Sequence, residues 1–220
     1  MRLFLLFFLF CSIIQINAQP QHAVEGNPRM VSRPIFVIPW DSIRGRISEI
    51  PQHIMGRGDI GAELLASFLL DENNNADRAF TEALAALYIA EAEAEGVNHV
   101  VAFAQMCLET GFLRYGGLVI PEMNNFCGLG AIGPGITGEW FPTAELGVRA
   151  HVQHLQAYAT SEPLRGELMD PRYRFVRRGS SPSIQGLAGS WAADPLYAEK
   201  IEGILQRLYF FYRINTPLKR

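Results

Sequence analysis

Apolar residues recur at helical spacing through most of the chain after residue 60, and this periodicity favours a mostly helical domain. Gly96 and Gly111 each follow such a stretch, and glycine suits the left-handed conformation that ends many helices. Thr143 precedes another stretch as a capping residue, and Asp194 with Pro195 suits the start of the last one. The predicted helices span 61–70, 76–95, 97–110, 144–159, 183–192 and 195–212.

The segment 113–142 interrupts this pattern, because it is rich in glycine and has no helical period. Its only strand-like run is Leu118-Val-Ile120. Long segments of this kind inside a domain are often functional. We expect a long functional loop or a small β-hairpin lobe, and therefore assign the chain to the α+β class, mostly α.

The N-terminus has an early positive charge at Arg2 and then a long apolar run that closes at Ala18. This pattern is typical of a secretory signal peptide and is too short for a good membrane span. Cys11 invites a lipoprotein interpretation, but the bulky Phe10 before it argues against that processing. We expect cleavage after Ala18 and an exported protein, located in the periplasm or cell envelope or outside the cell.

Cleavage would leave about 200 of the 220 residues, enough for one well-packed domain. The proline-rich stretch 19–58 is predicted as an N-terminal arm, either a tether or an arm packed along the domain, and 59–214 as the domain itself. The formal net charge of −3 provides no positive field for nucleic acid, so we expect no such partner. We also expect a monomer.

Two cysteines would remain after cleavage, Cys107 and Cys127. An exported chain can pair its cysteines, but Cys107 should lie on the buried side of its helix. We favour two free, largely buried thiols, since a free cysteine behaves as a small apolar residue.

A single carboxylate, Glu109, stands at the C-terminal end of the apolar helix predicted over 97–110. At about 100° per residue, Phe103 and Cys107 fall on the opposite side, so the apolar stripe should face inward and Glu109 outward. An ordinary solvated glutamate fits this pattern too. Against that, its neighbours on the same face are uncharged, the helix ends beside it, and the glycine-rich segment 124–131 can fold back over it. A desolvated carboxyl stays protonated to higher pH, as an acid that cleaves glycosidic bonds requires.

Three elements of the sequence resemble the glucosaminidase family of peptidoglycan hydrolases. Residues 104–111 match the family's pattern Ala-Gln-x-x-x-Glu-[Ser/Thr]-Gly, and residues 124–129 match Asn-x-Phe-x-Gly-[Ile/Leu]. Residues 191–201 look like its Trp-Ala-x-Asp-Pro-x-Tyr-x-x-Lys-Ile element. Each element alone is a weak signal, but the three in the right order are specific.

The resemblance implies a lysozyme-like helical domain with Glu109 at the floor of a sugar-binding groove. It also implies cleavage of the β-1,4 bond after N-acetylglucosamine in peptidoglycan glycan strands, by a protein peripheral to the cell wall, with Glu109 as general acid. Tyr197 matches the family's tyrosine and suits a hydrogen bond to the 2-acetamido group or a water, or it is simply a half-buried helix residue. Two rivals remain: a lytic transglycosylase and a non-catalytic cell-wall-binding module.

The group that stabilises the positive charge after protonation is open at this point. Many glycosidases use a second carboxylate, and Glu122 and Glu139 in the loop segment are candidates, with Glu139 preferred. Solvated loop glutamates are the plainer interpretation of both. Alternatively, members of the resembling family are thought to use the substrate's own acetamido group, and then no second carboxylate is needed.

Aromatic residues around Glu109 suit the apolar faces of sugar rings, although they also suit a small core. The substrate-binding residues that we expect are Gln105, Asn125, Phe126, Trp140 and Trp191. The basic run 172–178 is either a solvated loop or a contact for the carboxylates of stem peptides.

His151 and His154 share a helix face and invite a metal interpretation. No Glu-x-x-His motif or cysteine pair accompanies them. We therefore expect no metal site and no cofactor.

Overall fold

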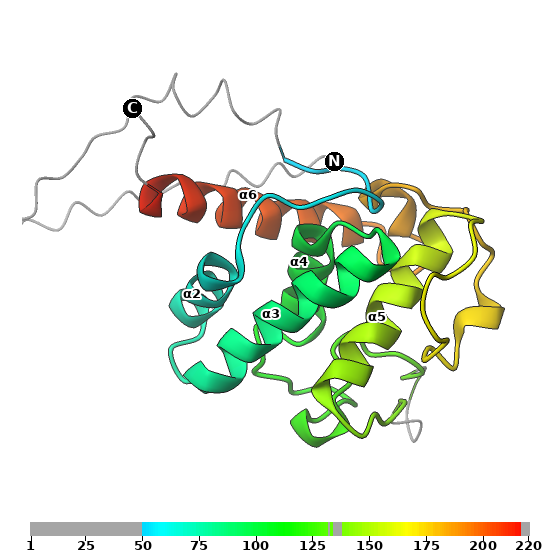
Figure 1. Cartoon of the computed structure of the whole chain (residues 1–220), viewed down its shortest axis with the longest axis horizontal. Coiled ribbons are helices and arrows are strands. Elements are labelled where there is room, and N and C mark those ends of the chain that lie inside the picture. The colour runs from blue at the N-terminus through cyan, green and yellow to red at the C-terminus, as the bar shows by residue number, and fades with distance from the viewer. Residues whose placement is uncertain (1–49, 132, 134–137, 217–220) are drawn as a thin grey trace, which may run out of the picture. The chain divides into compact units, whose positions relative to one another are not determined.

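The computed structural model describes residues 50–131, 133 and 138–216. The predicted signal peptide 1–18 and most of the predicted arm 19–58 lie outside these residues. Within the described part, the α-helices are α2 (Ala62–Glu72), α3 (Arg78–Glu95), α4 (His99–Glu109), α5 (Ala144–Ala159) and α6 (Tyr197–Asn215), as Figure 1 shows. Short 3-10 helices span Pro121–Met123, Tyr173–Phe175 and Ile184–Leu187. The prediction of a mostly helical domain is confirmed.

Local signals explain several of the helix ends. Gly96 ends α3 in the left-handed conformation, with φ of 75°. The side chain of Thr143 caps α5 by accepting a hydrogen bond from the backbone N–H of Leu146 at 3.3 Å. Both ends of α5 match the predicted bounds.

The C-terminal part of the prediction needs two corrections. The helix predicted over 183–192 is wrong, because only the 3-10 helix Ile184–Leu187 forms there. The last helix begins at Tyr197 rather than at Pro195, and Asp194 accepts a hydrogen bond from Leu196 N in the turn that leads into it. Its other end, at Asn215, lies beyond the predicted bound.

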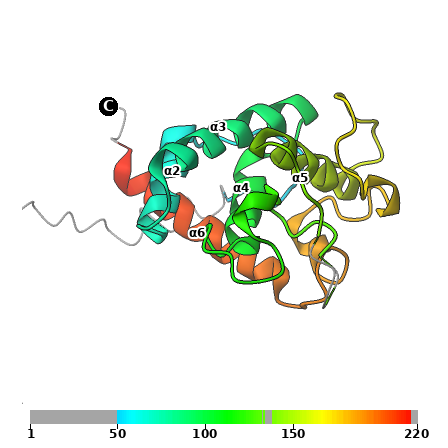
Figure 2. The same cartoon turned by 90° about the horizontal axis from the view of Figure 1, so that it is seen from below.

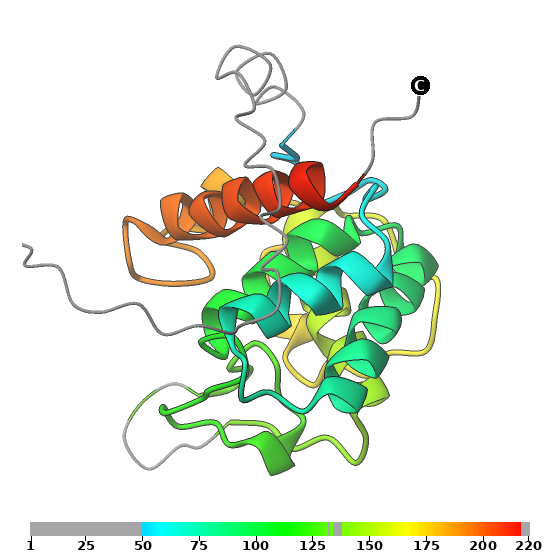
Figure 3. The same cartoon turned by 90° about the vertical axis from the view of Figure 1, so that its left-hand side faces the viewer.

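The described residues of the glycine-rich segment between α4 and α5 form mainly irregular loops. Figure 3 shows this green segment below the helices. The described residues of 113–142 contain the 3-10 helix Pro121–Met123 and no named strand, so the β-hairpin is not confirmed. Leu118-Val-Ile120, the predicted strand-like run, is irregular.

Helix α4 lies at the centre of the domain, with α3, α5 and α6 packed around it (Figure 2). All of its residues from His99 to Cys107 are buried. The prediction of one inward stripe with an outward face was therefore wrong, and an apolar helix of this kind is buried on all sides. Only the C-terminal turn, which includes Glu109, reaches solvent. Cys107 and Cys127 are both free and buried, as predicted.

Residues 50–58 of the predicted arm contact the helical domain. Met55 forms an isolated bridge with Val97. The backbone N–H of Ile54 donates to the carbonyl of Pro182 at 3.0 Å. No helix among the described residues is long and apolar enough to cross a membrane.

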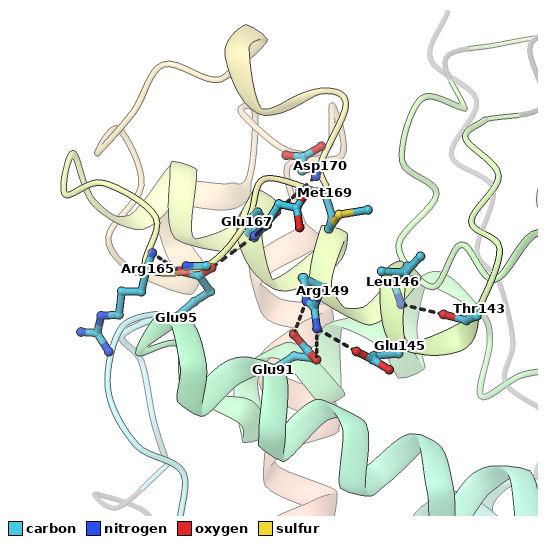
Figure 4. A network of polar contacts seen from close by, with 12 residues as sticks. Glu91, Glu95, Thr143, Glu145, Leu146, Arg149, Arg165, Glu167, Met169 and Asp170 are labelled. Atoms are coloured by element: carbon cyan, nitrogen blue, oxygen red, sulfur yellow. Dashed lines mark hydrogen bonds and ion pairs between the residues drawn. The ribbon is translucent and has the colours of Figure 1, made fainter.

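The irregular segment 160–182 is held onto α3 and α5 by polar contacts, several of which Figure 4 shows. The buried carboxylate of Glu95 accepts hydrogen bonds from Arg165 N at 2.8 Å and Gly166 N at 3.2 Å. Gln153 bonds the backbone of the same segment at Met169 N, 2.7 Å away. Because this segment continues into residues 171–176, these contacts also position one wall of the site described next.

Candidate active site

Glu109 is the last residue of α4, and its carboxyl is held by side chains from the third sequence element. Oε1 accepts a hydrogen bond from the indole Nε1 of Trp191 at 3.2 Å and another, very short, from the hydroxyl of Tyr197. Gly111, with φ of 57°, turns the chain away directly after the helix. The backbone thus ends the helix where the carboxyl can reach a cavity.

Burial is the main influence on the acidity of this carboxyl. Burial raises the pKa of Glu109 above its ordinary value, and the hydrogen bonds from Tyr197 and Trp191 partly oppose this by stabilising the carboxylate. The net shift of the pKa is upward. Glu109 therefore stays protonated to higher pH than a solvated glutamate, which is the property that a general acid needs.

The Glu109 carboxyl opens into a cavity of about 270 Å³. Its lining includes Tyr115, Asn125 and Gly128 besides Glu109. The backbone of Gly128 lies beside Oε2, the other oxygen of the Glu109 carboxyl, since a Cβ built on Gly128 would be 3.7 Å from Oε2. Among the described residues, no hydrogen bond engages Oε2. This oxygen is therefore available to a ligand in the cavity.

A second hollow of about 220 Å³ adjoins the first, because Gly128 and Ala131 line both. Its walls include Trp191, Arg172 and Phe175. The Trp191 ring packs edge-on against His154, with centroids 5.0 Å apart. The two hollows, which share Gly128 and Ala131, are together called the groove below; Glu109 lines one of them, and aromatic and cationic side chains line the other.

A larger hollow, about 650 Å³, lies elsewhere, between the chain around Gly58 and α3. Its ion pair, Arg57 with Glu93, is exposed and 4.0 Å long. The imidazole of His99 is engaged by the carbonyl of Ile60 at 2.9 Å. Asp59 lines this hollow and accepts a hydrogen bond from the Tyr209 hydroxyl, whereas Glu109 accepts hydrogen bonds from both Trp191 and Tyr197. We therefore place the candidate site at Glu109 in spite of the smaller volume there.

Asn125 lines the cavity but is mainly engaged in shaping its loop. Its side-chain amide donates to the carbonyls of Leu129 and Glu139, at 2.9 and 3.0 Å, and its Oδ1 accepts from Leu129 N at 2.9 Å. These three contacts close the loop that brings Gly128 to Glu109. They explain why an asparagine stands there.

The other predicted residues are divided between the site and the core. Gln105 is fully buried and donates to the hydroxyl oxygen of Tyr197 at 2.8 Å. Phe126 is also fully buried and packs near Phe80, so its ring belongs to the core rather than to a sugar-binding wall. Trp140 is 59% exposed, and it is not a lining residue of either hollow.

Glu139, the preferred second carboxylate, is likewise not among the lining residues. Its side chain lies against Gly130, where a Cβ would be 3.0 Å from Oε1 of Glu139. The Tyr197 hydroxyl accepts a hydrogen bond from Gln105 and donates one to Glu109, so it contacts the carboxyl directly. Its hydrogen bond to a substrate group or a water stays a prediction.

Two further residues contact this network: sequence reasoning missed Tyr88, and it considered His151 only as a possible metal ligand. The Tyr88 hydroxyl lies 2.8 Å from Nδ1 of His151, and Nε2 of His151 lies 3.0 Å from Oε1 of Gln105. Burial, together with neighbouring His154, lowers the pKa of His151 to about 3. The sequence placed His151 and His154 on one helix face, but it did not indicate which residues each of them meets.

His151 and His154 do not share a ligand site. His154 pairs with Asp170, its Nδ1 lying 2.7 Å from the carboxylate, while His151 faces Gln105. The described residues contain no group of three or more side chains that could hold a metal ion.

Comparison with known proteins gives two matches. Residues 85–210 match the glucosaminidase family model, described as mannosyl-glycoprotein endo-beta-N-acetylglucosaminidase. A Borreliella burgdorferi protein, named only "Uncharacterized protein", is 39% identical over 162 residues, which cover 74% of this chain and 79% of that protein. No solved structure matches the chain.

Proposed function

The chain belongs to the glucosaminidase family, and on this basis we propose that it is an exported N-acetylglucosaminidase that hydrolyses peptidoglycan with Glu109 as general acid. Family membership supports a glycoside hydrolase that acts on peptidoglycan. The finer proposal is cleavage of the β-1,4 bond after N-acetylglucosamine. It includes export through residues 1–18, an arm over 19–58, a catalytic domain over 59–214, and a monomer peripheral to the wall.

The main support is the asymmetric environment of the Glu109 carboxyl. Oε1 accepts hydrogen bonds from Trp191 and Tyr197, whereas Oε2 lies beside Gly128 at the cavity. In the proposed reaction the protonated carboxyl donates from Oε2 to the oxygen of the leaving sugar as the glycosidic bond breaks. Aromatic residues of the adjoining hollow suit the apolar faces of the sugar rings.

We propose that the substrate's 2-acetamido oxygen attacks the anomeric carbon, in place of a protein nucleophile. Glu109 is the only carboxylate among the described lining residues of the 270 Å³ cavity. Residues 132 and 134–137, which lie outside the described residues, contain no aspartate or glutamate. Water then attacks the cyclic intermediate and returns a proton to Glu109, which restores the acid.

Replacement of Glu109 by glutamine tests the assignment, because it preserves size and hydrogen bonding but removes the transferable proton. We expect glycan cleavage to fall at least about a hundredfold, the usual contribution of a general acid. Purified protein is assayed on cell-wall sacculi, with the exposed Glu199→Gln as the matched control. Activity retained in Glu109→Gln would falsify the assignment.

The product identifies the bond and the reaction class. Mass spectrometry of the released muropeptides should find reducing N-acetylglucosamine ends. Anhydro ends would instead identify a lytic transglycosylase, and binding without any soluble product would identify a wall-binding module.

The Glu139→Gln variant separates the two sources of charge stabilisation. With acetamido participation its rate should stay within about tenfold of the wild type, whereas loss of a catalytic nucleophile costs far more. A loss as large as that of Glu109→Gln would show that Glu139 moves into the groove.

A further inference from the structure

A chain of hydrogen bonds crosses the core and ends at the candidate acid. It runs from the Tyr88 hydroxyl to His151, then through Gln105 and Tyr197 to Glu109, with successive distances of 2.8, 3.0 and 2.8 Å before the short final contact. Its members come from α3, α5, α4 and α6. The first three are fully buried, so water does not take part in these contacts.

The direction of donation along the chain is determined by the atoms that meet. If Tyr197 donates to Glu109, its oxygen accepts from the amide nitrogen of Gln105. The carbonyl oxygen of Gln105 then faces His151 Nε2, which must carry a hydrogen. Nδ1 of His151 is therefore bare and accepts the hydroxyl hydrogen of Tyr88.

The opposite direction of donation is less favourable at both Glu109 and Tyr88, the two ends of the hydrogen-bond chain. Glu109 would carry its proton on the inner oxygen, Oε1, and donate it to Tyr197. Gln105 would be turned over, and His151 would carry its hydrogen on Nδ1 and donate to Tyr88. The hydroxyl hydrogen of Tyr88 would then have no acceptor among the described residues, and a buried unsatisfied donor is costly.

We propose that His151, oriented by Tyr88, sets the direction of this chain and thereby keeps the transferable proton of Glu109 on Oε2, the oxygen that faces the groove. Both residues are positioning residues, since they act through Gln105 and Tyr197. The inference rests on the proposed role of Glu109 as the acid. The direction of hydrogen-bond donation can be tested without any measurement of activity.

The neighbouring groups keep this direction over the working pH range. His151 faces Tyr88 from α3 and His154 on its own helix, and burial keeps its imidazole neutral by lowering the pKa to about 3. Glu109 faces Tyr197 from α6 and Cys127 from the loop, and burial raises the pKa of both. Neither the tyrosine nor the thiol ionises near neutral pH.

The tautomer of His151 is directly measurable by nitrogen-15 NMR of the full-length protein. We expect the hydrogen on Nε2 and a bare Nδ1 in the wild type between about pH 5 and 8. In Tyr88→Phe we expect a mixture of tautomers, because the phenyl ring offers Nδ1 no donor. A wild-type hydrogen on Nδ1, or an unchanged tautomer in Tyr88→Phe, would overturn the proposal.

Kinetics test the consequence for the acid. In Tyr88→Phe the value of kcat should fall about fivefold, the effect of one net hydrogen bond, with KM unchanged. The alkaline limb of the rate profile should move to higher pH, because Tyr197 donates less to the carboxylate. Tyr209→Phe is the matched control, since it removes the hydroxyl that donates to Asp59 at 2.5 Å from another buried tyrosine.

A second pair of variants separates direction from packing. Glutamine at position 151 offers an amide donor to Gln105 and a carbonyl acceptor to Tyr88, so His151→Gln should keep the wild-type pH profile. His151→Leu has neither group and should show the alkaline shift. Equal profiles for the two would contradict the proposal. If the wild type does not cleave sacculi but shows the Nε2–H tautomer, the direction is supported and the hydrolase assignment is at fault.

Discussion

At the scale of single residues, the acidity of Glu109 reflects two opposed effects. Burial raises its pKa, and donation from Tyr197 and Trp191 lowers it. Mutation can test the effect of hydrogen-bond donation on this pKa, because Trp191→Phe removes the indole donor while keeping an aromatic ring against His154.

We expect Trp191→Phe to move the alkaline limb of kcat/KM to higher pH by about half a unit, the equivalent of one weak hydrogen bond. The sign follows because loss of a donor disfavours the carboxylate, so the proton leaves at higher pH. The measurement is the pH dependence of glycan cleavage on soluble fragments. A limb displaced to lower pH would be inconsistent with donation from Trp191 to Glu109.

The same raised pKa affects stability. A folded-state pKa above the unfolded one contributes stability that is present at low pH and lost as pH rises through the folded pKa. The Glu109→Gln variant does not lose stability in this way as pH rises. The difference in unfolding temperature, variant minus wild type, should therefore be larger at pH 8 than at pH 4. Thermal unfolding at the two pH values tests this, with Glu199→Gln as control. A difference that does not grow with pH would refute it.

At the scale of elements, α5 makes a close backbone contact with the loop before Phe126. A Cβ at Gly147 would lie 1.8 Å from the carbonyl oxygen of Asn124, so the two backbones touch. We expect Gly147→Ala to lose about 2 kcal/mol or more of unfolding free energy, because the loop must move. Activity should fall with it, since this loop brings Gly128 to Glu109.

Chemical denaturation and the rate on sacculi measure the two effects. Gly203→Ala in α6 is the matched control, because a Cβ there meets nothing within 4 Å. Similar behaviour of the two variants would mean that the loop accommodates the side chain without moving away from α5.

The irregular segment after α5 brings a positive charge to the groove. Arg172 lines the hollow beside Trp191, and its guanidinium lies 5.0 Å from the centroid of the Phe175 ring. Peptidoglycan fragments have stem-peptide carboxylates, whereas chitooligosaccharides are neutral. This distinction makes a role in substrate choice testable.

We expect Arg172→Gln to raise KM for stem-peptide fragments about fivefold, as for loss of one charge-assisted contact, and to leave chitooligosaccharide binding unchanged. Arg177→Gln is the matched control, since this exposed arginine lines neither hollow. An equal effect on both substrates would indicate a packing role for Arg172.

At the scale of the whole molecule, the sequence was informative where interactions are local. Helix periodicity, Gly96 and Thr143 were sufficient to predict most of the helices, because capping depends on a few neighbouring residues. The resemblance that rests on three short elements is confirmed by the family match over 85–210. The predicted helix over 183–192 failed because apolar spacing alone does not distinguish a buried helix from an irregular buried segment.

The site was predictable only in part, because its geometry depends on tertiary contacts. Glu109 and Trp191 were identifiable as candidates, but nothing local indicates that Oε1 accepts from both Trp191 and Tyr197. The burial of Phe126 and the position of His151 depend on how the helices pack around α4. These are long-range features that a periodicity count does not capture.

The way in which one groove wall is anchored has a consequence for how this protein can diversify. Glu95 and Gln153 hold the segment after α5 through its backbone, at Arg165 N, Gly166 N and Met169 N. Main-chain atoms are the same whatever side chains follow them. This side of the groove can therefore exchange most of its side chains without losing its attachment, so its surface can change in evolution or by design while Glu109 stays in place.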